Sequence, residues 1–346
     1  MPPLSEADLQ HVLDHTGGLW EELRGGRIFV TGGTGFFGCW LLETFARANE
    51  QLGLNAQLLA LTRSPEAFAR KAPHLAGHPA ITLWRGDVRD FDFPGGKFSH
   101  VIHAGTASGA PVDPLEMFDT IVNGTRRTLD FAASGGVEKF LFVSSGAVYG
   151  PQPPGLERVP ETCLGAPDPT DPNAAYGEGK RAAELLCTLF CKARGIEVKI
   201  ARCFAFVGPH LPLDAHFAIG NFIRDALSGG PIRVKGDGTP VRSYLYAADL
   251  AVWLWTLLFQ GTPGRACNVG SMEAVSIADL AGKVAAVISP ETTVTIQTPP
   301  DPSVLPARYV PDTTRAVREL GLRVRVSLEE AIRRTGAWHR LPAARE

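Results

Sequence analysis

The chain has 346 residues, of which 45% are hydrophobic and 20% charged, with a formal net charge of -2 at pH 7. This length allows two lobes or one extended domain, and the charge provides no overall field that would favour nucleic acid or an anionic membrane as a partner. The six cysteines form no C-x-x-C pair, so we expect a reduced protein without a metal site. A polar, acidic start and the lack of an apolar run of about 20 residues predict a cytoplasmic protein.

The first half of the chain alternates predicted strands and helices. Ser5 and Asp8 predict a short helix that ends near His15, within an N-terminal helical extension at residues 1–24. The strands predicted next are 27–31, 57–62, 81–85, 100–103 and 139–144, and the long helices are 37–51 and 114–133. Such alternation predicts an α/β fold with a Rossmann-type, doubly wound parallel sheet.

The second half of the chain is less regular. Residues 151–172 are rich in Pro, Asp and Glu and are predicted to form an irregular excursion. A helix from about Ala174 to Arg194 and a strand at 198–202 follow, after which the alternation weakens. We therefore expect a Rossmann domain at residues 25–202, with its sheet completed by later segments, and a smaller C-terminal α/β substrate lobe at residues 203–346.

A glycine-rich loop follows the first predicted strand. Gly32, Gly35 and Gly38 form a G-x-x-G-x-x-G pattern that leads into a helix. Missing side chains let the backbone approach a pyrophosphate, and the helix N-terminus supplies N–H donors. A tight turn alone can also require glycine, but the position at the start of a βαβ pattern favours dinucleotide binding. The other loop residues predicted to contact the cofactor are Thr34, Phe36 and Phe37.

The end of the second predicted strand bears on the choice of cofactor. Folds that prefer NAD usually carry an acidic residue there, whereas this chain has Thr62, Arg63 and Ser64. A guanidinium beside a hydroxyl suits a 2′-phosphate, so the sequence favours NADP over NAD; the alternative is a solvated Arg63 that stacks on adenine. Asp87, just past the third strand, is placed to accept a hydrogen bond from adenine or only to start a turn.

Tyr176 and Lys180 form the strongest catalytic signal. They stand one helical turn apart, so both side chains can reach the same pocket. A nearby ammonium stabilises a phenolate, which lowers the pKa of the phenol towards the range of a general base. Ser145, at the end of a predicted strand, adds a hydroxyl that can share the substrate's oxygen with Tyr176.

These motifs resemble the extended short-chain dehydrogenase/reductase family of nucleotide-sugar epimerases, 4,6-dehydratases and decarboxylases. The matching segments are Thr31–Gly38, Gly86–Val88, Val101–Ala104, Asn123–Thr125, Ser144–Gly150, Tyr176–Lys180, Arg202, Gly208-Pro209 and Arg242–Asp249. The resemblance implies an NAD(P)-dependent enzyme in which Tyr176 takes the proton of a sugar hydroxyl, Lys180 also holds the nicotinamide ribose, and Ser145 binds the reacting oxygen. It also implies cofactor contacts from Val88, His103, Ala104, Gly105, Val143 and Cys203.

The same resemblance implies the substrate side and the assembly. Asn123, Asn221, Arg242 and Arg308 are expected to line the substrate, with the arginines binding the pyrophosphate of a nucleotide sugar. Asn123 could instead tie its helix to the sheet, and Arg308 could be a surface residue. Helices 114–133 and 174–194 are expected to pair in a homodimer. The apolar positions of that face are Phe118, Val122, Leu185 and Leu189, unless they pack on their own sheet.

Departures from the family pattern bear on the reaction type. The dehydratases carry Asp-Glu directly after the catalytic hydroxyl and the decarboxylases carry Glu in the second place, whereas this chain has Gly146 and Ala147. Neither residue can transfer a proton, which argues against dehydration and weakens decarboxylation. We therefore expect a nucleotide-sugar 4-epimerase; the alternatives are a 4-keto-sugar reductase and then a decarboxylase or 4,6-dehydratase. A non-catalytic dinucleotide-binding sensor is the alternative from another class.

Overall fold

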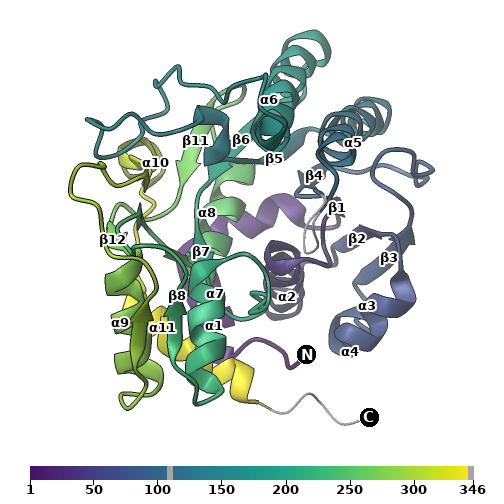
Figure 1. Ribbon diagram of the computed structural model, residues 1–346. Coiled ribbons are helices and arrows are strands. Elements are labelled where there is room, and N and C mark those ends of the chain that lie inside the picture. The colour runs from purple at the N-terminus through teal and green to yellow at the C-terminus, as the bar shows by residue number, and fades with distance from the viewer. Residues whose placement is uncertain (107–111, 342–346) are drawn as a thin grey trace.

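A seven-stranded parallel sheet forms the centre of the protein, as seen in a computed structural model that describes residues 1–106 and 112–341 (Figure 1). The strand order is β11-β6-β5-β4-β1-β2-β3. The strands are β1 (Arg27–Thr31), β2 (Gln57–Thr62), β3 (Ile81–Arg85), β4 (His100–His103), β5 (Lys139–Ser145), β6 (Glu197–Cys203) and β11 (Ala266–Val269). Strands β1, β2 and β3 follow one another towards one edge of the sheet, and β4, β5, β6 and β11 follow one another from β1 towards the other edge. This order confirms the predicted doubly wound Rossmann-type sheet.

Helices cover both faces of the sheet. The helices α2 (Phe36–Gln51) and α8 (Ala247–Gln260) pack on one face, where Ile28, Val30 and Leu141 point. The helices α5 (Pro114–Ser134) and α6 (Ala175–Arg194) lie side by side on the other face, against Phe29, Phe140 and Phe142. Successive strand residues thus enter different cores, as the alternation of a β-strand requires. The short helices α3 (Pro65–Lys71) and α4 (Pro73–Ala76) lie between β2 and β3 in the chain.

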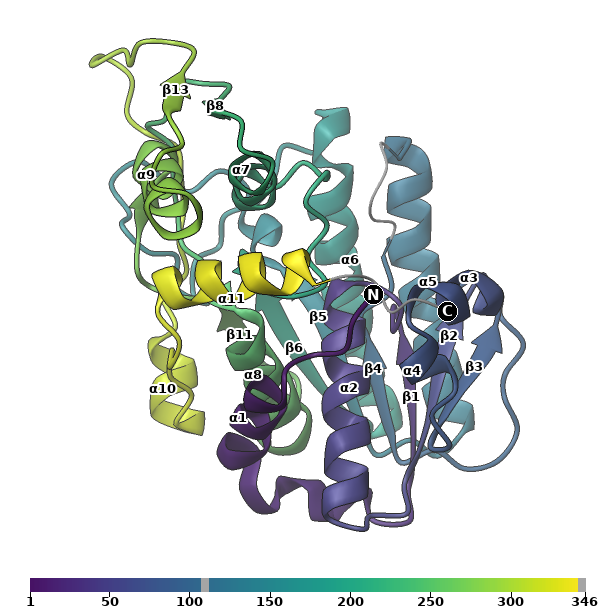
Figure 2. The ribbon, with the colours of Figure 1, turned by 90° about the horizontal axis from the view of Figure 1, so that it is seen from below.

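A smaller lobe occupies one end of the molecule, away from β2 and β3 (Figure 2). Its helices are α7 (Ala218–Leu227), α9 (Ile277–Ile288), α10 (Thr314–Leu320) and α11 (Leu328–Arg340). Its short strands form the pairs β8 (Ile232–Val234) with β13 (Val294–Ile296), β7 (Phe206–Val207) with β10 (Leu245–Tyr246), and β9 (Val241–Arg242) between β12 (Val275–Ser276) and β14 (Arg308–Tyr309). The lobe is interleaved with the sheet layer, because α8 and β11 belong to that layer.

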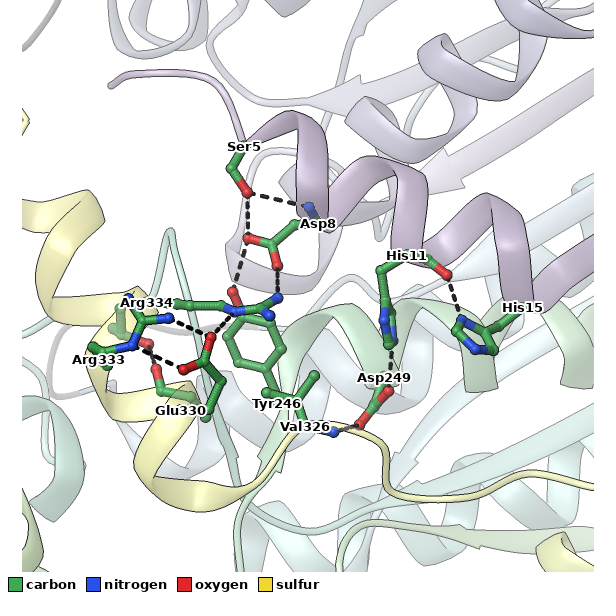
Figure 3. A network of polar contacts seen from close by, with 12 residues as sticks. Ser5, Asp8, His11, His15, Tyr246, Asp249, Val326, Glu330, Arg333 and Arg334 are labelled. Atoms are coloured by element: carbon green, nitrogen blue, oxygen red, sulfur yellow. Dashed lines mark hydrogen bonds and ion pairs between the residues drawn. The ribbon is translucent and has the colours of Figure 1, made fainter.

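The N-terminal helix packs into the rest of the chain rather than lying outside it. Ser5 caps α1 (Glu6–Thr16), as the sequence predicts, by accepting from the N–H of Asp8. The buried Asp8 carboxylate accepts from the Tyr246 hydroxyl at 2.9 Å and from Arg334 at 2.7 Å (Figure 3). His11 lies 2.8 Å from the buried Asp249. These contacts of buried charges join α1 to α8 and α11, so the N-terminal extension is part of the packed fold.

The predicted excursion after β5 is irregular but anchored. Short 3₁₀ turns stand at Gly146–Tyr149 and Pro172–Ala174, and between them Val159 forms a bridge with Pro311. This bridge places the excursion beside β14, at the carboxyl end of the sheet. Within residues 1–106 and 112–341, no helix is long and apolar enough to cross a membrane.

Candidate active site

The loop between β1 and α2 can follow its tight path only because glycines stand in it. Gly32 has φ +73°, and a Cβ there would lie 2.5 Å from the carbonyl oxygen of Ala104. A Cβ on Gly38 would lie 2.3 Å from the carbonyl oxygen of Gly32. Gly35 precedes the first turn of α2, whose N-terminal N–H groups have no side-chain cap. The loop therefore fits a dinucleotide that is bound through main-chain donors.

His103 is a buried side chain that supports this loop. Its Nδ1 lies 2.6 Å from Thr31 Oγ1 and its Nε2 lies 3.0 Å from Thr125 Oγ1. Thr31 Oγ1 also accepts from the N–H of Gly105. Burial lowers the pKa of His103 to about 3, so the ring is neutral. Both ring nitrogens are used inside the protein, so His103 positions the loop; its contact with the cofactor stays a prediction.

The expected ribose and adenine residues lie at the ends of β2 and β3. The Arg63 side chain is exposed, and Ser64 caps α3 by accepting from the N–H of Ala67 at 3.3 Å. Asp87 is already bound by Arg89, whose hydrogen bonds lower the pKa of the carboxyl group; the charge of Arg63 adds to the effect. Arg89 is thus a neighbour that sequence reasoning missed, and it keeps Asp87 ionised.

Ser145, Tyr176 and Lys180 are brought together at the carboxyl ends of β5 and β6. Ser145 ends β5, where it pairs with Cys203 of β6. The phenol of Tyr176 on α6 lies near enough for the Ser145 hydroxyl to lower its pKa, although no direct hydrogen bond joins the two described side chains. The Lys180 ammonium lies 6.0 Å from the centre of the Tyr176 ring and donates to the carbonyl oxygen of Val143 at 2.8 Å. The structure thus brings these three residues together, and their catalytic roles stay predictions.

The electrostatics of the phenol differ from the sequence expectation. The pKa of Tyr176 is raised, because the cost of burying the phenolate exceeds the stabilisation by Ser145. Burial also lowers the pKa of Lys180 to about 8. The expected lowering by Lys180 is wrong for the protein without ligands, because the ammonium is bound to Val143 instead of the phenol. Ser145 is the group that lowers the pKa of Tyr176 against this effect of burial.

A buried ion pair fixes the neighbouring strand ends. The Arg202 guanidinium donates to Glu184 at 2.6 Å and to the Tyr149 hydroxyl at 2.9 Å. Glu184 also accepts from the Ser144 hydroxyl at 2.6 Å. Because each charge is paired and hydrogen-bonded, burial of the pair is tolerated. The network ties β5, β6 and α6 together next to Ser145.

The space beside Gly146 is filled by aromatic side chains from the C-terminal lobe. A Cβ on Gly146 would lie 2.7 Å from the Tyr309 hydroxyl and 2.8 Å from the Phe204 ring. The Tyr309 hydroxyl lies 3.5 Å from Ser145 Oγ. A carboxylate at position 146 would therefore require Tyr309 and Phe204 to move. The sequence did not predict roles for Tyr309 and Phe204; the available signals were that Tyr309 follows the expected substrate residue Arg308 and that Phe204 follows the expected cofactor contact Cys203.

The two arginines that were expected to bind substrate, Arg242 and Arg308, lie on different faces of their strands. Arg242 pairs with Tyr309 across β9 and β14, and its guanidinium lies 5.8 Å from the centre of the Tyr309 ring. Arg308 precedes Tyr309 and therefore points to the other face of the strand, where it donates to the carbonyl oxygen of Glu157 at 3.4 Å. The strand geometry thus brings Arg242, and not Arg308, to the side of Ser145.

The two expected asparagines make local bonds. Asn123 is exposed on α5 and donates to Asp119 one turn earlier, so it does not tie its helix to the sheet. Asn221 on α7 accepts from Arg224 at 3.1 Å. No described contact joins either residue to Ser145 or Tyr176, and their roles in substrate binding stay predictions.

Comparisons with known proteins place this fold and site in one family. The family model described as the NAD dependent epimerase/dehydratase family matches residues 28–270. The chain belongs to this family, which confirms the resemblance seen in its motifs.

Similar proteins of known name include UDP-glucuronic acid decarboxylases. UDP-glucuronic acid decarboxylase 1 of Arabidopsis thaliana is 30% identical over 309 residues, covering 89% of this chain and 68% of that protein. UDP-glucuronic acid decarboxylase 6 of the same plant is 30% identical over 312 residues, covering 88% and 86%.

Solved structures show the same fold. The UDP-glucose 4-epimerase of Thermotoga maritima has a TM-score of 0.74 at 21% identity, covering 91% of this chain and 98% of that one. The dTDP-glucose 4,6-dehydratase DesIV of Streptomyces venezuelae, solved with NAD bound, has a TM-score of 0.75 at 24% identity, covering 91% and 97%.

Proposed function

We propose that this protein is an NAD(P)-dependent enzyme that oxidises C4 of a nucleotide sugar, and that its reaction is decarboxylation of a nucleotide-activated uronic acid. The observation that carries the reaction type is the set of relatives named UDP-glucuronic acid decarboxylase, 30% identical over 88–89% of this chain. The relatives thus favour an alternative that the sequence analysis ranked below the 4-epimerase.

The roles of the chain's own residues follow from their places. Tyr176 takes the proton of the C4 hydroxyl, and Ser145 donates a hydrogen bond to the same oxygen. Lys180 is expected to turn its ammonium from Val143 to the ribose of the cofactor. A nicotinamide bound next to them supplies the hydride acceptor for C4. The glycine loop at Gly32 and Gly38 holds the pyrophosphate through main-chain N–H groups.

Loss of carbon dioxide does not strictly need the carboxylate that Ala147 lacks. Oxidation at C4 turns a uronic acid into a β-keto acid. Its C5–C6 bond can then break, with the electron pair passing to the C4 oxygen as an enolate while C6 leaves as carbon dioxide. Ser145 and the protonated Tyr176 are placed to stabilise that enolate oxygen. C5 then takes a proton, and reduction of C4 completes the reaction.

A 4-epimerase is the second candidate, and Gly146 with Ala147 favours it. Epimerisation needs only removal and return of hydride at C4, and it uses no acid or base besides Tyr176. The filled space beside Gly146 also disfavours a dehydratase, which requires a carboxylate there by the family pattern. A 4-keto-sugar reductase would use the same residues for half of this chemistry.

The cofactor and the assembly are part of the proposal. The DesIV structure contains NAD, while the exposed Arg63 favours NADP; binding titrations with both cofactors on wild type and Arg63→Ala decide between them. A homodimer is supported by large exposed apolar side chains on α5 and α6. These are Leu115, Phe118, Leu185 and Leu189, which therefore do not all pack on their own sheet.

Incubation with UDP-glucuronate tests the proposed function. Decarboxylation gives a UDP-pentose lighter by one carbon dioxide, epimerisation gives a product of unchanged mass and altered chromatographic retention, and dehydration gives a product lighter by one water. Mass spectrometry after chromatography separates these outcomes. UDP-glucose serves as the matched substrate without a carboxylate, and Tyr176→Phe as the enzyme control. An unchanged mass with a new retention time would favour the 4-epimerase instead.

A further inference from the structure

Two phenols from distant parts of the chain meet at one serine hydroxyl. Tyr176 comes from α6 and Tyr309 from β14. The Tyr309 hydroxyl contacts Ser145 Oγ, and the Tyr176 phenol lies near enough for Ser145 to lower its pKa. The distance from Tyr309 Oη to Ser145 Oγ is 3.5 Å. The N–H of Ala147 donates to the same serine oxygen at 3.1 Å. Ser145 Oγ thus has three polar neighbours but only one proton of its own.

The number of protons and lone pairs sets the direction of these bonds. A serine oxygen has two lone pairs and one proton, whereas an amide N–H can only donate. The Ala147 N–H occupies one lone pair. If Tyr309 donates to the second, the Ser145 proton is directed to Tyr176. Burial raises the pKa of Tyr309, so this phenol keeps its proton and remains a donor.

We propose that Tyr309 is a positioning residue that orients the Ser145 hydroxyl towards Tyr176 and thereby stabilises the Tyr176 phenolate. The proposal rests on the proposed function, in which Tyr176 is the base. The Tyr309 ring is held 4.6 Å from the Phe204 ring, between centroids. Gly146 leaves the space that the Tyr309 hydroxyl occupies. Tyr309 would thus place a neutral donor where the dehydratases of the family carry a carboxylate.

Other groups face the two phenols from each neighbouring element. They are Lys180 on α6, Cys203 on β6 and Arg242 on β9. Burial raises the pKa of the Cys203 thiol, so this neighbour stays uncharged. The charge of Arg242 favours a phenolate at Tyr309. All three remain in place when only the Tyr309 hydroxyl is removed, so a change in Tyr176 can be assigned to that hydroxyl.

The test is a direct titration of Tyr176 in Tyr309→Phe, which keeps the ring against Phe204. The protein has five tyrosines, so phenolate absorbance of Tyr176 is obtained as the difference between a protein and its Tyr176→Phe counterpart. The pKa of Tyr176 is expected to rise by about one unit, because a hydrogen bond to a charged group is typically worth ~1.5 kcal/mol and one pKa unit is ~1.4 kcal/mol. This readout needs no substrate.

Further variants test whether the shift in the pKa of Tyr176 passes through Ser145. Tyr244→Phe removes another buried hydroxyl near Arg242 that has no described bond to Ser145, and it should leave the pKa of Tyr176 unchanged. In a Ser145→Ala background Tyr309→Phe should have no further effect, because the coupling passes through Ser145. Phe204→Leu, which loosens the Tyr309 ring, should shift the titration in the same direction as Tyr309→Phe.

An unchanged Tyr176 titration in Tyr309→Phe overturns the proposal. The same shift in the Ser145→Ala background overturns it too, because the effect would then bypass Ser145. Failure of the proposed function gives a different result. Wild type would then convert none of the nucleotide sugars, while the titration of Tyr176 would still respond to Tyr309.

Discussion

The Lys180 ammonium donates a hydrogen bond to the main-chain carbonyl of Val143, with 2.8 Å between nitrogen and oxygen. Val143 lies two residues before Ser145 on β5, and Lys180 lies one turn after Tyr176 on α6. The bond therefore holds the helix that carries the phenol against the strand that carries the hydroxyl. Burial lowers the pKa of this ammonium to about 8, so its charge is lost in mildly alkaline solution.

Lys180→Met is expected to reduce turnover by about 10²–10⁴-fold, the usual range for loss of acid–base catalysis, because Tyr176 loses the Lys180–Val143 bond that holds its helix against β5. Cofactor binding should weaken as well, since the same ammonium is expected to hold the ribose. Steady-state kinetics and calorimetric titration with NAD and NADP measure the two effects. Lys192→Met, an exposed position on the same helix, is the matched control. Wild-type turnover in Lys180→Met would contradict the assignment.

The same variant gives a pH-dependent stability difference. The unfolded chain keeps a proton on Lys180 up to about pH 10.5, whereas the folded protein loses it above about pH 8. Between these values the unfolded state binds more protons, so wild type gains stability as the pH rises from about 8 to about 10.5. Lys180→Met lacks this gain. Denaturant unfolding across that range should show the free energy of unfolding of wild type rising relative to the variant; a constant or falling difference would be inconsistent with the buried ammonium.

Gly146→Ala tests the packing of Tyr309 and Phe204 beside Ser145. The new Cβ would lie 2.7 Å from the Tyr309 hydroxyl, so a destabilisation of ~1–3 kcal/mol is expected for such overpacking, together with loss of turnover. Gly155→Ala is the control, because nothing lies within 4 Å of a Cβ there. Urea unfolding and kinetics of both variants check the prediction, and equal stability of the two would count against the described contact.

Arg242→Ala and Arg308→Ala should separate the two arginines that the sequence treats alike. Arg242 lies on the Tyr309 face, so its loss is expected to raise KM for the nucleotide sugar by about 10–100-fold, as for a hydrogen bond to a charged group. Arg308 points to the other face and binds Glu157, so its loss should change KM little. Steady-state kinetics with one substrate for all three proteins is sufficient. The reverse order of effects would mean that β14 turns when substrate binds.

Leu185→Asp combined with Leu189→Asp is expected to convert the proposed dimer into a monomer. Their side chains are 60% and 52% exposed on α6, and a charge on each would have to be buried in a dimer interface. Leu164→Asp is the control, since Leu164 is more exposed than either but lies in the excursion outside α5 and α6. Light scattering measures the mass of each protein. A wild-type monomer would refute the predicted assembly.

The sequence predicts the parts of this protein in which local patterns are strong. The bounds of β1, β2, β3 and β4 agree with the predicted strands, because apolar runs there are bounded by glycine and polar residues. The cluster of Ser145, Tyr176 and Lys180 follows from helical spacing and a strand end. These signals are carried within short stretches of the chain.

The features that sequence reasoning missed depend on contacts between distant segments. Tyr309 reaches Ser145 from a two-residue strand, which has too few residues for a periodic pattern to indicate its inward face. Arg308 was predicted to bind substrate because of its charge, whereas the adjacent Tyr309 is the residue that lies on the side of Ser145. The pKa direction of Tyr176 was predicted from Lys180 alone, whereas burial decides it. The burial of Asp8 depends on Tyr246 and Arg334, which lie 238 and 326 residues away in the chain, so no local pattern indicates it.

Turnover of UDP-glucuronate deuterated at C4 tests the central claim, oxidation and re-reduction of that carbon, most directly. The account predicts slower turnover than with unlabelled substrate and a product that retains deuterium at C4, because the same hydride leaves and returns. Substrate deuterated at C2 is the matched control and should react at the unlabelled rate. Equal rates for the C4-labelled and unlabelled substrates, with the C4 label lost to water, would contradict the account.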